Sequence, residues 1–223
     1  MPVFQIHWYI INKMYSVKEV YYTIQGEGYH TGRPAVFLRF AGCNLWTGLE
    51  KDREKAICNF CDTDFVGTNG PGGGKFNSSE KLAQHTLSFW PDYSKSNPFV
   101  VCTGGEPLLQ IDKDFIDSFH HFGFEIAVET NGTIIPPEGI DWVCVSPKIG
   151  SELKLKNGNE LKFVYPQSKV DPKEFENLSF DHFSLQPKDD ENREKNTKKT
   201  IDYCHEHPNW SVSLQTHKFL GIP

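Results

Sequence analysis

The sequence predicts an α/β domain built on parallel strands. Short apolar runs such as residues 99–102 alternate with segments of helical pattern, and this alternation is typical of parallel β/α units. Each polar or glycine-rich motif directly follows an apolar run. The motifs should therefore gather on one face, at the carboxyl ends of the strands of a barrel-like sheet. A chain of 223 residues is short for eight β/α units, which favours an open barrel of about six strands.

The elements are assigned in chain order from the apolar runs and the turn residues. Residues 15–25 indicate an extended segment, and the apolar run 35–40 has a charge near its end, as in a buried barrel strand. The charged segment 47–57 favours a short surface helix, and five glycines within 67–77 indicate a loop. We further expect helices at 80–90, 112–122 and 191–207, and strands at 99–102, 125–129, 142–145, 161–165, 182–185 and 211–215.

Composition and charge narrow the class of protein. Hydrophobic residues make up 38% and charged residues 23% of the sequence, as in an ordinary globular protein. A net charge of −6 without a long basic run argues against nucleic acid as a partner. The apolar stretch from Val3 to Ile11 is too short to span a membrane, and it lacks a basic flank and a small-residue cleavage site. We therefore expect a cytoplasmic protein with no membrane partner.

No linker or internal repeat divides the sequence. Residues 1–223 are therefore expected to form a single domain, with residues 1–13 as a candidate N-terminal extension.

Three of the six cysteines form a pattern that indicates a metal centre. Cys43, Cys58 and Cys61 are spaced C-x14-C-x2-C, and the two residues between the last two let both thiolates reach one centre. Three thiolates are one ligand short of a closed tetrahedral zinc site. They suit a four-iron cluster in which the fourth iron stays open to another ligand. A zinc knuckle with His30 as fourth ligand is the alternative.

Further motifs follow the strands, namely Cys61-Asp62-Thr63, Thr103-Gly104-Gly105-Glu106-Pro107, Glu129-Thr130-Asn131-Gly132 and Ser146-Pro147-Lys148. With these motifs the sequence resembles the radical S-adenosylmethionine (SAM) superfamily. Its cluster loop has eleven residues more than the usual C-x3-C-x2-C, and in this it is similar to the 7-carboxy-7-deazaguanine synthase family. The resemblance covers residues 15–223 and implies a single radical SAM domain, folded as a modified partial (β/α)6 TIM-like barrel.

The resemblance implies three cofactors and a set of residues for each. A [4Fe-4S] cluster would be held by Cys43, Cys58 and Cys61. The Thr63 hydroxyl, a hard oxygen ligand, would bind Mg²⁺; the alternative is a hydroxyl hydrogen-bonded within its own loop. The backbone of the GGEP motif would bind the amino group of SAM. The implied SAM contacts are Phe60, Asp62, Gly104, Gly105, Glu106, Ser146, Pro147, Lys148, Gln186, Pro187, Lys188 and Asp189.

The implied substrate is 6-carboxy-5,6,7,8-tetrahydropterin, which carries a carboxylate and several ring N–H groups. Arg39 is a cation near the end of an apolar run and is suited to bind that carboxylate bidentately. In the resembled family the C-terminal carboxylate, here that of Pro223, meets the pterin; the alternative is a tail that only covers core surface. The implied substrate contacts are Ile24, Gln25, Gly26, Glu27, Arg39, Thr103, Glu129, His217 and Pro223.

The resemblance implies contraction of the pterin ring to 7-carboxy-7-deazaguanine with loss of ammonia, a step of queuosine and 7-deazapurine synthesis. It also implies a homodimer and an electron donor such as flavodoxin or ferredoxin. The residues leave two other readings open. One is a radical SAM activase of a glycyl-radical protein, and the other is a non-catalytic, metal-stabilised binding module.

Overall fold

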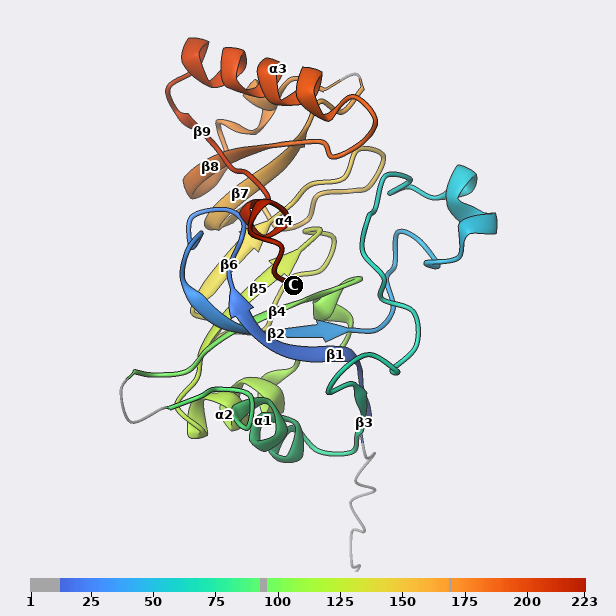
Figure 1. Ribbon diagram of the computed structural model, residues 1–223, viewed down its shortest axis with the longest axis vertical. Helices are drawn as coiled ribbons and strands as arrows, with labels where there is room; N and C mark the ends of the chain where they lie inside the picture. The colour runs from blue at the N-terminus through green and yellow to red at the C-terminus, as the bar shows by residue number, and fades with distance from the viewer. Residues whose placement is uncertain (1–12, 93–95, 169) are drawn as a thin grey trace, which may run out of the picture.

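The computed structural model describes residues 13–92, 96–168 and 170–223, which form one mixed β-sheet with helices packed against it (Figure 1). Nearly all of the candidate N-terminal extension, residues 1–12, lies outside the described residues. The strands are β1 (Tyr15–Ile24), β2 (Pro34–Phe40), β3 (Gly74–Phe76), β4 (Phe99–Gly104), β5 (Glu125–Thr130), β6 (Trp142–Val145), β7 (Asn157–Tyr165), β8 (Ser179–Pro187) and β9 (Trp210–Val212). The α-helices are α1 (Ser79–Leu87), α2 (Lys113–His121), α3 (Arg193–Glu206) and α4 (Thr216–Leu220), and the 3-10 helices are η1 (Glu50–Lys55), η2 (Pro107–Leu109) and η3 (Pro172–Phe175).

The sheet is open and mostly parallel. Its strand order is β3-β1-β2-β4-β5-β6-β7-β8-β9. β2 and β4 to β9 run parallel to one another, whereas β1 pairs antiparallel with both β2 and β3. This arrangement confirms the predicted α/β partial barrel. The parallel part has one strand more than the six expected, because the short β9 pairs with β8.

Alternation along the strands decides which side chains reach the inner face of the sheet. Leu38 and Phe40 of β2 are buried in a core with α1 and α2, so Arg39 between them points to the opposite face. In β7, Phe163 belongs to a second core beside α3, which leaves Lys162 on the inner face. The same alternation turns inward the polar strand residues Thr103, Glu129, Ser184 and Gln186.

Three elements differ from the expectations. The segment 47–57 holds only a 3-10 helix of six residues, η1, and the glycine-rich segment 67–77 contains β3, which pairs with the start of β1. The last strand ends at Val212 rather than at 215. At the next residue, the Ser213 hydroxyl accepts a hydrogen bond from the backbone N–H of Gly28 at 2.8 Å, and the chain then turns into α4.

The helices pack on the outside of the sheet. α1 and α2 lie together beside the blue and green strands in Figure 1, and α3 lies along β8 and β9. Within the described residues, no helix combines the length and the apolar character that a membrane crossing requires.

Candidate active site

A cavity of about 420 Å³ opens on the inner face of the sheet, at the carboxyl ends of the parallel strands. Its walls come from the inner faces of β1, β2, β4, β5, β7 and β8, from the cluster loop (residues 43–65) and from the C-terminal segment with α4. Every site residue predicted from the sequence lines this cavity except Glu106 and Pro147. One space therefore joins the expected cluster, cofactor and substrate residues.

Cys43, Cys58 and Cys61 lie on the wall formed by the cluster loop. Among the described residues, no three His, Cys, Asp or Glu side chains surround a point that one metal ion could occupy. A zinc knuckle would need His30 as its fourth ligand. His30, the proposed fourth ligand of that knuckle, packs instead against the Trp142 ring, with centroids 4.3 Å apart.

The three thiols of the cluster loop differ in the direction of their pKa shifts. A hydrogen bond between Cys58 and Cys61 raises the pKa of Cys58 and lowers that of Cys61 to about 6. Burial raises the pKa of Cys43, whose Sγ accepts a hydrogen bond from the backbone N–H of Leu45 at 3.4 Å. Binding of iron requires thiolates and displaces the protons that remain. The donor set thus suits an iron-sulfur cluster held at three of its irons.

Glycine is required at both GG positions of the GGEP motif, because the backbone there packs directly against the segment before Cys43. A Cβ at Gly104 would lie 2.2 Å from the backbone oxygen of Phe40, and one at Gly105 would lie 2.1 Å from that of Gly42. Gly104 also has a φ of +132°, which favours glycine. The backbone N–H of Glu106 donates to the oxygen of Gly42 at 2.9 Å. The motif therefore fixes the position from which Cys43 enters the cavity.

Glu106 does not line the cavity. Its side chain is fully buried, where Oε1 accepts hydrogen bonds from Leu108 N at 3.0 Å and Thr130 Oγ1 at 2.8 Å. Oε2 accepts from Asn131 N at 2.8 Å. Its carboxylate thus joins the start of η2 to the end of β5. Glu106 supports the site with its side chain, and only its backbone remains for a cofactor.

Two of the residues expected to bind SAM, Lys148 and Lys188, lie near the ring of Phe60 in the cluster loop. Lys188, which follows β8, has its Nζ 5.5 Å from the centroid of the Phe60 ring, and Lys148, which follows β6, has its Nζ 6.0 Å from it. Two cations near one aromatic ring form cation–π contacts with it, and the ring lies on the same cavity wall as the cysteines.

Lys218 ties α4 to the expected SAM side of the cavity. Its Nζ donates to Asp62 Oδ2 at 2.9 Å and to Asp189 Oδ2 at 2.5 Å. Asp62 belongs to the cluster loop and Asp189 to the segment after β8, so this lysine joins three separate parts of the wall.

Arg39 is held in place by β1. Its Nε donates to Glu19 Oε1 at 2.7 Å, and its Nη2 donates to the Tyr21 hydroxyl at 3.0 Å. Glu19 lies opposite Arg39 in the β1–β2 register, and the Tyr21 ring stacks on Phe37 at 5.6 Å. A guanidinium carries five N–H donors, and the described residues engage two of them, which leaves three for an anion.

The Thr63 hydroxyl lies at the cavity wall and, within the described part of the chain, has no hydrogen-bond partner. The alternative in which this hydroxyl bonds within its own loop is therefore not what the structure contains. An uncommitted oxygen beside a cavity fits a ligand for Mg²⁺, which takes few protein ligands and several waters.

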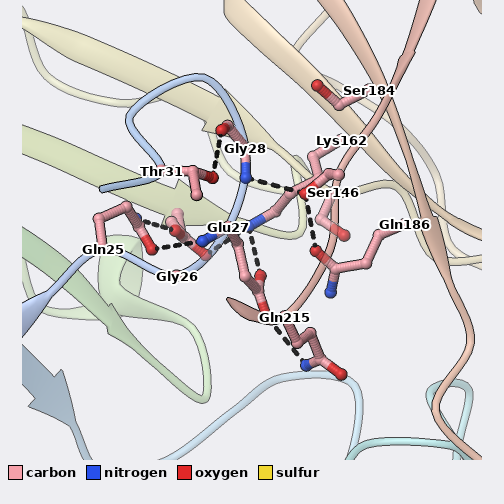
Figure 2. Close-up of polar contacts among 12 residues, drawn as sticks. Gln25, Gly26, Glu27, Gly28, Thr31, Ser146, Lys162, Ser184, Gln186 and Gln215 are labelled. Carbon is pink, nitrogen blue, oxygen red and sulfur yellow. Dashed lines mark hydrogen bonds and ion pairs between the residues drawn. The ribbon is translucent and has the colours of Figure 1, made fainter. Parts of the chain in front are cut away.

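Lys162 of β7 is the centre of a charged network on the cavity wall (Figure 2). Its Nζ lies 2.6 Å from Glu27 Oε2 and 3.0 Å from Glu129 Oε2. Gln215 Nε2 donates to the other oxygen of Glu27 at 2.9 Å, and Gln25 Nε2 donates to the other oxygen of Glu129 at 2.9 Å.

Charge governs the protonation of this network. Burial disfavours the Glu27 carboxylate, but Lys162 outweighs it and lowers the pKa of Glu27 to about 2. Burial likewise disfavours the Lys162 ammonium, and Glu129 and Glu27 nevertheless raise its pKa well above the usual value. Glu27 and Lys162 are therefore both charged at neutral pH.

The C-terminal segment lies across the mouth of the barrel, next to the end of β1 (Figure 1). The backbone N–H of Thr216 donates to the oxygen of Gly26 at 2.9 Å, and Thr23 Oγ1 donates to the backbone oxygen of Pro223 at 2.8 Å. Phe219 is 68% exposed and Leu220 is 63% exposed. The tail therefore does not cover core surface with its apolar side chains, and it brings His217 and Pro223 to the cavity.

Sequence reasoning missed several cavity residues. Lys162 had a usable signal, because a lysine inside the apolar run Leu161–Val164 resembles the situation of Arg39. Glu19 and Tyr21 could have been inferred only from the β1–β2 register, and Gln215 and Lys218 only from the path of the tail.

Comparisons with known proteins give the family. The 7-carboxy-7-deazaguanine synthase of Bradyrhizobium diazoefficiens is 58% identical over 208 residues, covering 93% of this chain and 99% of the relative. That of Burkholderia multivorans is 53% identical over 209 residues, covering 94% and 99%. The crystal structure of QueE from Escherichia coli is similar with a TM-score of 0.64 at 25% identity, covering 90% of this chain and 93% of that one. No family model matches the chain.

The identity extends over almost the whole length of both chains, and the structural similarity independently supports the partial barrel. The cysteines and the free oxygen ligand described above fit the cofactors of such enzymes, a [4Fe-4S] cluster, SAM and Mg²⁺. The chain therefore belongs to the 7-carboxy-7-deazaguanine synthase family of radical SAM enzymes.

Proposed function

We propose that this protein converts 6-carboxy-5,6,7,8-tetrahydropterin into 7-carboxy-7-deazaguanine with loss of ammonia, in the synthesis of queuosine and related 7-deazapurines. The observation that carries the proposal is the single cavity that joins the three cysteines to a ring of polar groups from Arg39 to Pro223. Relatives of nearly the same length, with up to 58% identity, bear the name of this activity.

The cofactors supply the hard chemistry, namely reductive cleavage of SAM to give the radical that abstracts hydrogen. The chain has to bind, orient and shield the reacting groups. Cys43, Cys58 and Cys61 hold the cluster. The backbone of Gly104, Gly105 and Glu106 takes the amino group of SAM. The remaining SAM contacts in the proposal are Phe60, Asp62, Ser146, Pro147, Lys148, Gln186, Pro187, Lys188 and Asp189.

The substrate takes the other half of the cavity. The free N–H groups of Arg39 bind its carboxylate through charge-assisted hydrogen bonds. Glu27 and Glu129 accept ring N–H groups with the lone pairs that Lys162 leaves free. Thr63 contributes its hydroxyl to Mg²⁺, and the carboxylate of Pro223 accepts a further N–H. Ile24, Gln25, Gly26, Thr103 and His217 complete the proposed contacts.

We also propose a cytoplasmic homodimer that receives electrons from a small carrier such as flavodoxin or ferredoxin. The proposal of an electron donor rests on the [4Fe-4S] cluster, because the cluster must receive one electron before SAM can be cleaved reductively.

The decisive experiment is anaerobic reconstitution of the cluster, followed by mass spectrometry of the products from SAM and 6-carboxytetrahydropterin. The proposal expects one 7-carboxy-7-deazaguanine and one ammonia for each substrate consumed. Cleavage of SAM without any change of the pterin would exclude this substrate and favour the activase. One equivalent of zinc with no sulfide would exclude the radical enzyme and favour the binding module.

A further inference from the structure

Lys162 has no role in the function proposed above, although it forms part of the cavity wall. It is 3% exposed, and its ammonium lies beside Glu27 of the loop after β1 (Figure 2). On its other side lies the carboxylate of Glu129 in β5. A buried ion triad is seldom favourable for stability by itself, since both signs of charge must be desolvated. Its place in the wall of the substrate half suggests another use.

The network leaves the carboxylates partly unsatisfied, on the side of the cavity. Among the described residues, each of the four carboxylate oxygens receives one donor: Lys162 supplies two, and Gln215 and Gln25 supply one each. A carboxylate oxygen can accept about two hydrogen bonds. Glu27 and Glu129 therefore keep acceptor capacity, and all five side chains of the network line the cavity.

The surroundings make Lys162 the cation that both carboxylates share. Glu160 of β7 also faces Lys162 and favours its charged form, whereas burial raises the pKa of the nearby Cys144 thiol of β6 and keeps that thiol uncharged at neutral pH. His217 faces Glu27 from α4. None of these groups replaces a permanent cation between the two carboxylates at neutral pH.

We propose that Lys162 is a positioning residue for the pterin, which holds Glu27 and Glu129 at a fixed separation and ionised together, so that both accept N–H groups of the pyrimidine edge. This inference rests on the proposed function, because it assigns the two carboxylates to that substrate. It extends that function by naming the residue that sets the spacing and the charge of the acceptor pair.

Removal of the ammonium has a specific consequence. Two neighbouring carboxylates without a shared cation cannot both stay ionised easily, so the apparent pKa of the pair rises and one proton is bound as the pH falls. A protonated carboxyl has lost an acceptor. Pterin binding should therefore weaken toward acid pH, by up to about tenfold per pH unit below the new pKa, as expected for one linked proton.

The test uses reconstituted holoenzyme in four forms: wild type, Lys162→Met, the double variant Lys162→Met/Glu129→Gln, and Phe163→Leu. Phe163 is the next residue of the same strand, is fully buried in the core on the outer face and does not line the cavity, so it controls for damage to β7. The KM for the pterin is measured from pH 6 to pH 9 and divided by the wild-type value at each pH. Iron content, SAM affinity and the Tm are measured alongside.

The expected result is a KM ratio for Lys162→Met of about tenfold or more at neutral pH, rising further toward pH 6. Iron content and SAM affinity should match wild type. In the double variant the ratio should stay high but become flat with pH, because no carboxylate pair remains to bind the proton. Phe163→Leu should give a ratio near one throughout.

A flat KM ratio near one for Lys162→Met, with normal turnover by wild type, would overturn this inference and leave the proposed function intact. An equal, pH-independent loss of pterin binding, SAM affinity and iron content together with a lower Tm would also overturn it. That result would indicate that Lys162 only stabilises the fold. If wild type itself fails to bind or convert the pterin while cleaving SAM, the proposed function fails, and the inference with it. Should Lys162→Met not take up iron, Lys162→Arg takes its place. Its retained charge should keep the ratio flat with pH, and a rise toward acid would contradict the proposal.

Discussion

Gly26 lies directly beneath His217: a Cβ on residue 26 would be only 2.2 Å from the Nδ1 atom of the imidazole. The same glycine accepts, through its backbone oxygen, hydrogen bonds from the N–H and the hydroxyl of Thr216 at 2.9 and 3.0 Å. The loop after β1 and the C-terminal α4 thus meet at one residue without a side chain. This contact brings the tail to the substrate half of the cavity.

Gly26→Ala should move His217 and the tail away from the cavity. We expect the KM for the pterin to rise by about 10- to 100-fold, as a displacement of about 1 Å can cost in a positioned site. Iron content and SAM affinity should not change. Gly74→Ala is the matched control, since a Cβ there meets only the Phe76 ring at 3.5 Å. Equal KM values for the pterin in the two variants would show that the contact between Gly26 and His217 does not affect substrate binding.

Cys58→Ala should abolish the cluster and all cleavage of SAM. The three thiolates of the cluster loop have no spare partner in the cavity, whose lining contains no fourth cysteine among the described residues. Iron and sulfide analysis after anaerobic reconstitution measures the loss. Cys204→Ser on α3 should keep a full cluster. Wild-type turnover by Cys58→Ala would refute the ligand assignment.

Thr63→Val should weaken the dependence on Mg²⁺ while the cluster stays intact. Removing one group at a metal site commonly costs on the order of 10- to 100-fold in affinity. Activity is titrated against Mg²⁺ for wild type, Thr63→Val and Thr63→Ser, and the serine variant should stay close to wild type because it keeps the hydroxyl. Superimposable curves for the valine variant would remove Thr63 from the metal site.

A few residues added after Pro223 should impair turnover of the pterin. The backbone oxygen of Pro223 accepts a hydrogen bond from Thr23 at 2.8 Å, so a continued chain removes the carboxylate charge from this position. A charge-assisted hydrogen bond is worth roughly 1.5–3 kcal/mol, or about one to two decades in affinity. The same extension placed at the N-terminus is the control. If kcat/KM is the same for both forms at equal iron content, the carboxylate has no such role.

Glu106→Ala should lower the stability of the fold. The carboxylate accepts hydrogen bonds from Leu108 N, Asn131 N and Thr130 Oγ1 in a fully buried site. Each buried donor left without a partner costs about 1–3 kcal/mol, so a total loss of roughly 3 kcal/mol or more is expected in urea unfolding. Glu106→Gln, which keeps one oxygen acceptor, should lose less. A loss below about 1 kcal/mol for alanine would mean that water replaces the carboxylate.

The amino-acid sequence by itself determined the fold class, because the alternation of apolar runs and helical segments is a local pattern and parallel strands can be joined in few ways. It also indicated the site, since motifs that follow parallel strands must meet at one edge. Elements that depend on contacts between distant parts of the chain could not be predicted from the sequence. β3 forms because Gly74–Phe76 pairs with β1, and α4 begins where Thr216 bonds to Gly26, and neither partner is near in sequence.

Only the tertiary structure decided which partners each polar side chain has, and therefore whether it supports the fold or faces the cavity. Glu106 stands in a motif with the glycines, yet burial commits its side chain to Thr130 and Asn131. Lys162 stands in an apolar strand, and the sheet places its ammonium between Glu27, 135 positions away, and Glu129, 33 positions away. Sequence patterns carry the period of a strand, and hence which face a residue occupies. Which charges meet on that face depends on the register and order of strands, which the sheet as a whole sets.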